Sequence, residues 1–136
     1  MEKYILKHDL KVFGVQVKTF PLGIDEAFYE LIKKTDDCAD ERNYYGVSSI
    51  DHDGQIIYKA VAEEKYTNEA EKFNYEHTTI EKGEYFFTVL KGWSSKKHCI
   101  KDIFHEMMKD ERVDKTKPCV EWYKNDDEML CMVKAK

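Results

Sequence analysis

The chain has 136 residues, of which 42% are hydrophobic and 36% are charged, a balance typical of one packed domain with a solvated exterior. Its 22 Lys and Arg against 27 Asp and Glu give a formal net charge of -5, which argues against direct binding to nucleic acid or anionic lipid. No apolar run has the length of a signal peptide or a membrane span, so we expect a cytoplasmic protein.

The first predicted elements are a strand followed by a helix. Residues 13–20 are rich in strand-forming side chains, and Pro21 and Gly23 mark the turn that ends them. Residues 25–34 carry apolar side chains at helical spacing with charges between them, which predicts an amphipathic helix. Such a helix requires a sheet to cover its apolar face.

The middle of the chain predicts two hairpins. Residues 44–50 and 55–62 read as strands joined by a turn that contains Asp53 and Gly54, a strong hairpin signal. Residues 63–72 are charged and polar, and we expect a loop or a frayed ladder there. Residues 73–80 and 84–90 form the next pair of predicted strands, with a tight turn at 81–83.

The last predicted elements are a second helix and two further strands. Apolar residues recur through 96–110 at the spacing of one helix face, and residues 119–124 and 128–133 alternate as strands. The element order therefore repeats strand, helix, strand, strand. We expect one α+β domain over residues 1–136, built from duplicated β-α-β-β units with halves of about 1–66 and 67–136. Its antiparallel sheet carries two helices on one side, and a ligand cleft lies between the halves.

Short motifs distributed along nearly the whole chain carry a family resemblance. In chain order they are Val12-Phe13-Gly14-Val15, Tyr45-Gly46-Val47, Ile57-Tyr58, Gly83-Glu84-Tyr85 with Gly92 seven residues after the Tyr, and Pro118-Cys119-Val120-Glu121-Trp122-Tyr123. With these motifs the sequence resembles the GyrI-like small-molecule-binding family, which includes the effector-binding domains of AraC-type and MerR-type multidrug-responsive regulators.

The resemblance implies an aromatic-lined cleft and a buried Glu that pairs with lipophilic cations, and the motif match assigns that role to Glu121. The chain has no room for a helix-turn-helix, so it resembles the stand-alone members of the family. Some of these act as inhibitors or sequestering proteins. Others resemble hydrolases that open strained rings in genotoxic natural products.

Strand alternation gives an independent argument about Glu121. Within 119–124 it puts Cys119, Glu121 and Tyr123 on one face. If this face lines the cleft, the carboxylate stands among aromatic rings that favour a cation, and burial raises its pKa. The alternative is an exposed strand carboxylate.

The predicted ligand-binding residues combine Glu121 with aromatic side chains placed on the strands around the cleft and at its mouth. They are Glu121, Tyr45, Tyr58, Tyr85, Phe87, Trp93 and Tyr123. For each aromatic residue, ordinary core packing is the competing interpretation.

The remaining patterns predict no metal, no cofactor and no catalytic nucleophile, because the spacings that such sites require are absent. Four cysteines, Cys38, Cys99, Cys119 and Cys131, are expected to be free thiols. Three hypotheses result. The chain is a binding module for an amphipathic, cationic or aromatic small molecule, a hydrolase that uses Glu121, or an interaction module or inhibitor that recruits a protein partner.

Overall fold

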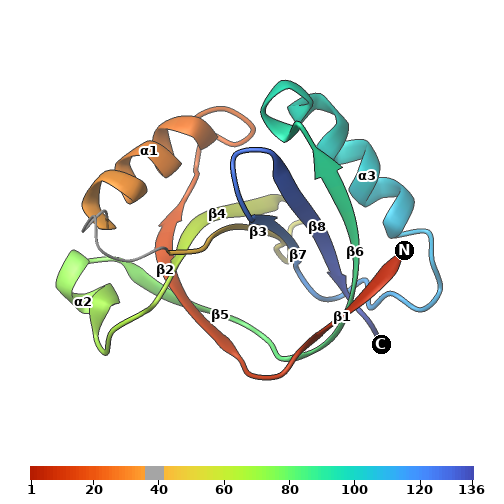
Figure 1. Cartoon of the computed structure of the whole chain (residues 1–136), viewed down its shortest axis with the longest axis horizontal. Helices are drawn as coiled ribbons and strands as arrows, with labels where there is room; N and C mark the ends of the chain where they lie inside the picture. Colours follow the sequence, from red (N-terminus) through yellow and green to blue (C-terminus); the bar gives the residue numbers. More distant parts are fainter. Residues whose placement is uncertain (36–41) are drawn as a thin grey trace.

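The computed structural model describes residues 1–35 and 42–136, and it arranges them as an eight-stranded antiparallel sheet with three helices (Figure 1). The strands are β1 (Glu2–Leu6), β2 (Leu10–Gln16), β3 (Tyr44–Ile50), β4 (Ile56–Glu63), β5 (Glu76–Ile80), β6 (Gly83–Lys91), β7 (Cys119–Tyr123) and β8 (Glu128–Lys134). The helices are α1 (Ile24–Thr35), α2 (Glu69–Phe73) and α3 (Ile100–Met107), with short 3-10 turns η1 (Trp93–Ser95) and η2 (Lys97–Cys99) before α3.

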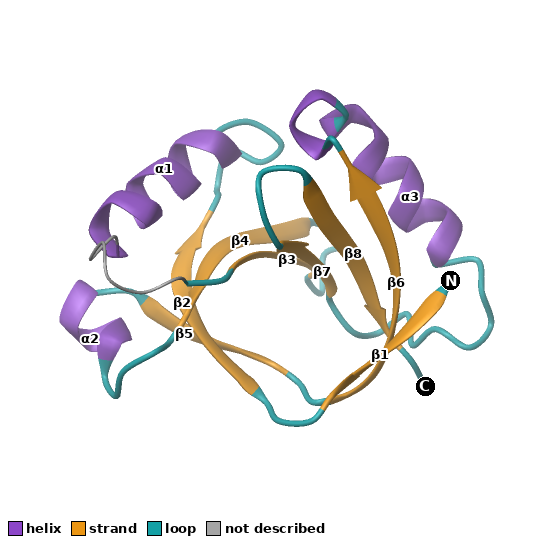
Figure 2. Ribbon diagram, in the orientation of Figure 1, coloured by secondary structure: helices purple, strands orange, loops and turns teal. Residues whose placement is uncertain are grey.

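The sheet has the strand order β1-β6-β8-β7-β3-β4-β2-β5, with β3 and β7 paired at its centre. The order strand, strand, helix, strand, strand occurs twice along the chain if the short α2 and the 3-10 turns are set aside. Each outermost strand pairs with a strand of the other half, β1 with β6 and β5 with β2. Figure 2 shows the sheet curled into a half-barrel with the helices around its outside. The predicted α+β class is confirmed.

Alternation along the strands divides the core between two faces of the curled sheet. The concave face carries a cluster that includes Val12, Val61, Val120 and Met132, all buried. The outer face packs against the helices. There, Leu31 of α1 packs with strand residues of the first half, and Met107 of α3 packs with strand residues of the second half.

Two elements were not predicted from the sequence. The short strand β1 lies in a segment whose charges conceal its alternation, and it is stabilised by pairing with β6. Helix α2 (Glu69–Phe73) lies mostly within residues 63–72, where the sequence predicts a loop or a frayed ladder, and it ends on Phe73, the first residue of a predicted strand. The first predicted strand is also displaced, because β2 occupies Leu10–Gln16 rather than residues 13–20.

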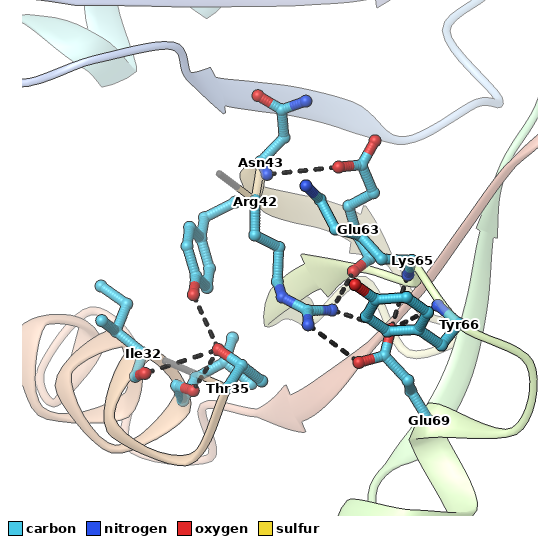
Figure 3. A network of polar contacts seen from close by, with 10 residues as sticks. Ile32, Thr35, Arg42, Asn43, Glu63, Lys65, Tyr66 and Glu69 are labelled. Atoms are coloured by element: carbon cyan, nitrogen blue, oxygen red, sulfur yellow. Dashed lines mark hydrogen bonds and ion pairs between the residues drawn. The ribbon is translucent and has the colours of Figure 1, made fainter. Parts of the chain in front are cut away.

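A buried polar network explains why α2 forms in a segment without helical periodicity (Figure 3). The Glu69 carboxylate accepts hydrogen bonds from the backbone N–H groups of Lys65 and Tyr66, at 2.6 and 2.9 Å. The Arg42 guanidinium donates to both of its oxygens, at 2.9 and 2.8 Å. Arg42 is 27 residues from Glu69 in the sequence, so local patterning does not reveal this part of the network.

The cysteine prediction is confirmed where the structure describes it. Cys99, Cys119 and Cys131 are free thiols, whereas Cys38 lies outside the described residues. The longest helix in the described part of the chain, α1, has 12 residues, and no helix there combines the length and apolarity needed to cross a membrane.

Candidate ligand-binding site

Glu121 lies at the centre of the sheet, on the outer face between the two halves. It occupies the middle of β7, where its backbone is opposite Gly46 of β3 on one side and Cys131 of β8 on the other. Its side chain is buried, with the residue only 8% exposed. A glutamate is rarely buried to this degree unless it has a partner.

The partners of the Glu121 carboxylate are two neutral hydroxyl groups. Tyr58 donates a hydrogen bond to Oε1 at 2.8 Å, and Tyr123 donates to the same oxygen at 2.5 Å. Among the described residues, no Lys, Arg or His forms an ion pair with Glu121. Burial raises the pKa of this carboxyl, and the hydrogen bonds from Tyr123 and Tyr58 oppose that rise only in part.

The close approach of these groups depends on Gly46. A Cβ atom at this position would lie 2.1 Å from the Tyr58 hydroxyl oxygen and 2.7 Å from Glu121 Oε1. No real side chain tolerates such contacts, so any other residue would displace the hydrogen-bonded pair. Glycine inside a strand often marks a place where another group approaches the backbone closely.

Three aromatic rings, Phe20, Phe28 and Trp93, pack on the two tyrosines, and we call them the aromatic cover. Phe20 stacks on the Tyr58 ring with 5.1 Å between centroids. Phe28 and Trp93 meet the Tyr123 ring edge to face, at 5.2 and 5.0 Å. Phe28 belongs to α1 and Trp93 to η1, so both halves of the molecule contribute to the cover.

Polar contacts hold the cover at the surface. The Trp93 indole N–H donates to the backbone oxygen of Asn125 at 2.9 Å, which fixes η1 to the β7–β8 turn. Lys97 of η2 forms an ion pair with Asp25 of α1 at 2.8 Å and thereby links the two halves. The side chains of Lys97 and Asp25 are both well exposed, so this ion pair is weak and easily opened.

The structure brings together four of the seven predicted residues and separates the other three. Tyr58, Tyr123 and Trp93 lie with Glu121, in hydrogen-bond or ring contact. The remaining three, Tyr45, Tyr85 and Phe87, belong to the cluster on the concave face.

The expectation that Tyr45, Tyr85 and Phe87 share a cleft with Glu121 is therefore wrong. Strand alternation is the physical reason, because Tyr45 is adjacent to Gly46, which faces Glu121, and so it points to the opposite side of the sheet. On β6, Phe86 packs on the helix side, which puts Tyr85 and Phe87 on the concave side.

Sequence reasoning missed three components of the site: Gly46, Phe20 and Phe28. Gly46 stands in a strand-forming run, where a glycine signals a close approach. Phe28 lies on the apolar face of a predicted helix, but its contact with Tyr123 is a tertiary contact that no spacing indicates. Phe20 was assigned to a strand, although it lies in the turn between β2 and α1.

The chemistry available at the site is that of a single buried carboxylate. Across residues 1–35 and 42–136, no three His, Cys, Asp or Glu side chains gather as metal ligands. Burial, with the nearby Glu121 carboxylate second, raises the pKa of Tyr58 and Tyr123, so both hydroxyls remain hydrogen-bond donors. The described residues thus supply a negative group, two donors and ring faces, but no cation.

Comparison with known proteins supports the fold. No family model and no curated protein matches the sequence. Among solved structures, SAV2435 bound to tetraphenylphosphonium is similar over 100% of this chain and 94% of that one, with a TM-score of 0.73 at 14% identity. The integron cassette protein VCH_CASS2 from the mobile metagenome of Vibrio cholerae gives a TM-score of 0.69 at 12% identity, over 99% of this chain and 95% of that one.

A third similar structure is a candidate bacterial transcription regulation protein from Staphylococcus aureus MU50, with a TM-score of 0.61 and 15% identity over 99% of each chain. At these identities the likeness establishes a shared fold. One of the proteins with this fold was solved with a small organic cation, and another carries a description of transcription regulation.

Proposed function

We propose that residues 1–136 form one cytoplasmic ligand-binding domain that holds a lipophilic organic cation between its two halves, with the Glu121 carboxylate as counter-charge. The observation that carries this proposal is a carboxylate in a residue only 8% exposed, whose partners are two tyrosine hydroxyls. The solved structure of SAV2435 with tetraphenylphosphonium, on the same fold, supports it.

The free energy for binding comes from the incomplete compensation of Glu121. An ionised carboxylate loses hydration on burial, and neutral hydroxyls replace only part of what a cation supplies. A unit charge about 4 Å away contributes about 4 kcal/mol at the effective dielectric constant of a protein surface. Ring faces of Tyr58 and Tyr123 add cation-π attraction. The same site selects against anions.

Binding requires the aromatic cover to move. Phe20, Phe28 and Trp93 pack on the two tyrosines that hold Glu121, so a ligand reaches the carboxylate only after these rings rotate or α1 and η1 separate. The displaced rings then pack on the ligand. An amphipathic cation with aromatic groups suits this exchange, since it replaces one set of ring contacts by another.

The described part of the chain is not suited to direct binding of DNA. In the described part of the chain, strands lie between the helices α1, α2 and α3, so no two of them form a helix-turn-helix. The net charge of -5 also disfavours a DNA backbone.

Isothermal titration with tetraphenylphosphonium and with neutral triphenylphosphine oxide tests the proposal. We expect Glu121→Gln to weaken binding of the cation by about tenfold or more, equivalent to about 1.4 kcal/mol. Binding of the neutral phosphine oxide should be unchanged. Glu30→Gln is the matched control, because it removes the same charge from an exposed position on α1.

Three results would count against a counter-charge at Glu121: no saturable binding of the cation, equal binding by Glu121→Gln, or equal loss in both variants. The ligand should also be recovered unchanged after incubation. A product that forms with wild type and not with Glu121→Gln would favour the hydrolase alternative, with Glu121 as general acid or base.

A further inference from the structure

A cavity lies on the face of the sheet opposite to Glu121, within the concave side of the half-barrel. Its volume is about 200 Å³. The floor includes the buried residues Tyr45, Val120 and Met132, while half-buried residues such as Tyr4 and Trp122 stand at its rim. None of the residues of the Glu121 site lines it. The cavity therefore opens to solvent independently of α1, α3 and the aromatic cover.

Three aromatic rings form one wall of this cavity. The Tyr4 ring meets the Trp122 ring edge to face with 6.0 Å between centroids, and the Tyr45 ring lies 6.2 Å from Trp122 at a tilt of 32°. The rings come from β1, β3 and β7, so both halves of the sheet contribute. Walls of this composition attract organic cations through the ring faces and also bury apolar groups.

The Glu63 carboxylate supplies a negative charge beside these rings. Glu63 lines the cavity at the end of β4 and is half-buried. Its Oε1 accepts a long hydrogen bond of 3.4 Å from the backbone N–H of Asn43. Burial raises the pKa of the Tyr45 hydroxyl, and the charge of Glu63 raises it further. The Glu63 carboxylate therefore acts on the same group that forms the aromatic wall.

The charge of Glu63 is not neutralised by a cationic side chain of the described residues, none of which forms an ion pair with it. Figure 3 shows the reason: the nearby Arg42 guanidinium is engaged by the Glu69 carboxylate and by the backbone oxygen of Glu63, at 2.8 Å, while the Glu63 carboxylate extends toward Asn43. A ligand cation can therefore serve as its partner.

We propose that this concave cavity is a second binding site, which takes a small aromatic ammonium ion with its ring against Tyr4, Tyr45 and Trp122 and its ammonium group at Glu63. Volume sets the size of the ligand, since an apolar cavity of about 150 Å³ holds one benzene molecule. A cavity of about 200 Å³ accommodates one ring with a short ammonium arm. It excludes a cation with four phenyl groups, so the two sites differ in the size of the ligand.

The two tryptophans allow each site to be observed separately, because the chain contains Trp93 and Trp122 and no others. Trp93 covers Glu121 and Trp122 lines the concave cavity. In a Trp93→Phe protein, all tryptophan emission reports the concave cavity. The probes are 2-phenylethylammonium and its neutral counterpart 2-phenylethanol, followed by Trp122 emission.

We expect saturable binding of 2-phenylethylammonium to the Trp93→Phe protein and a loss of about tenfold or more in affinity on adding Glu63→Gln. Binding of 2-phenylethanol should be the same with and without Glu63→Gln. Glu121→Gln, added in place of Glu63→Gln, should leave binding of both probes unaffected, which separates this site from the Glu121 site.

Val120→Phe is a second variant, which fills the cavity floor and should abolish binding of both probes. Thermal melting confirms that each variant is folded. The proposal is overturned if 2-phenylethylammonium causes no saturable change, if Glu63→Gln or Val120→Phe binds it as well as the parent protein, or if the loss follows Glu121→Gln instead. Tetraphenylphosphonium binding that survives Val120→Phe would leave the function proposed for Glu121 intact in each of these cases.

Discussion

Two glutamates of this protein are buried to nearly the same degree but have different surroundings. Glu69 is 4% exposed and Glu121 is 8% exposed. Glu69 has an arginine on both oxygens and two backbone N–H donors. Glu121 has two tyrosine hydroxyls, both on one oxygen. Burial alone therefore does not distinguish a structural carboxylate from a ligand-binding one.

The pKa values of the two carboxyls move in opposite directions. At Glu69, burial by itself raises the pKa, but hydrogen bonds from Arg42, Tyr66 and Lys65 outweigh it and lower the pKa to about 2. At Glu121, burial prevails over the hydrogen bonds and the pKa rises. The folded protein thus favours the charged form of Glu69 and disfavours that of Glu121. We interpret the first as a fixed structural link and the second as a charge available to a ligand.

The largest expected effect is on stability, when each glutamate is replaced by glutamine. Glu69→Gln breaks the buried ion pair between Glu69 and Arg42, so we expect a loss of roughly 3 to 5 kcal/mol in the free energy of unfolding. Glu121→Gln should be neutral or stabilising near neutral pH, since it removes an uncompensated buried charge. Urea titration of both variants measures the difference. Equal destabilisation would remove the distinction between the two sites.

A smaller loss in the free energy of unfolding is expected from Gly46→Ala, which inserts a methyl group between Tyr58 and Glu121. Overpacking of this kind costs about 1 to 3 kcal/mol, and the hydrogen-bonded pair must shift. Affinity for tetraphenylphosphonium should also change, because Glu121 moves. Gly54→Ala is the control, since a Cβ there meets no atom within 4 Å. Its positive φ of 80° adds a backbone cost but leaves the site untouched.

The contributions of the two glutamates to stability should change with pH in opposite directions. The stability that Glu69 contributes is present above its ordinary pKa of 4.5 and is lost as the pH falls toward about 2. The contribution of Glu121 is present below its unfolded pKa and is lost as the pH rises through its higher folded pKa.

Consequently, the free energy of unfolding that Glu69→Gln loses relative to wild type should become smaller on acidification. Any free energy of unfolding that Glu121→Gln gains relative to wild type should become smaller as well. The latter should change by at most about 1.4 kcal/mol per pH unit. Denaturant titrations at a series of pH values test both. An advantage of Glu121→Gln that grows toward acid would contradict the raised pKa of Glu121.

The smallest expected effect concerns the exposed ion pair between Lys97 and Asp25. Lys97→Ala should change the free energy of unfolding by less than about 1 kcal/mol, as is usual for exposed pairs. It should raise the association rate of tetraphenylphosphonium, because the link between α1 and η2 is lost. Stopped-flow mixing measures this rate, and Lys109→Ala, which removes an exposed pair elsewhere, is the control. An unchanged rate would show that the Lys97–Asp25 pair does not control access to the site.

Much of the fold followed from local patterns. Hairpin β3–β4 was predicted by its Asp-Gly turn, and the structure shows Asp51 accepting the backbone N–H groups of Asp53 and Gln55 there. The alternation within 119–124 correctly put Glu121 and Tyr123 on one face. Helix α2 was missed because part of what holds it is the tertiary pairing of Glu69 with Arg42, of which the sequence shows no local sign.

The candidate site was predicted in part. The motif assigned Glu121, and alternation added Tyr123, both of which depend on one strand only. The residues of a neighbouring strand that lie on the same side as Glu121 are set by the pairing register. A register shift of one residue moves all of them to the other face of the sheet. Tyr45 was therefore assigned to the wrong side, since the sequence does not show that Gly46, and not Tyr45, is opposite Glu121.

The most direct test of the central claim is the number of protons released when tetraphenylphosphonium binds. Isothermal titration in buffers of different ionisation enthalpy measures it from about pH 4 to about pH 8. Because a cation lowers the raised pKa of Glu121, wild type should release up to one proton within part of this range, and Glu121→Gln should release none. Tight binding without proton release at any pH, or equal release by both proteins, would contradict the pairing of Glu121 with the cation.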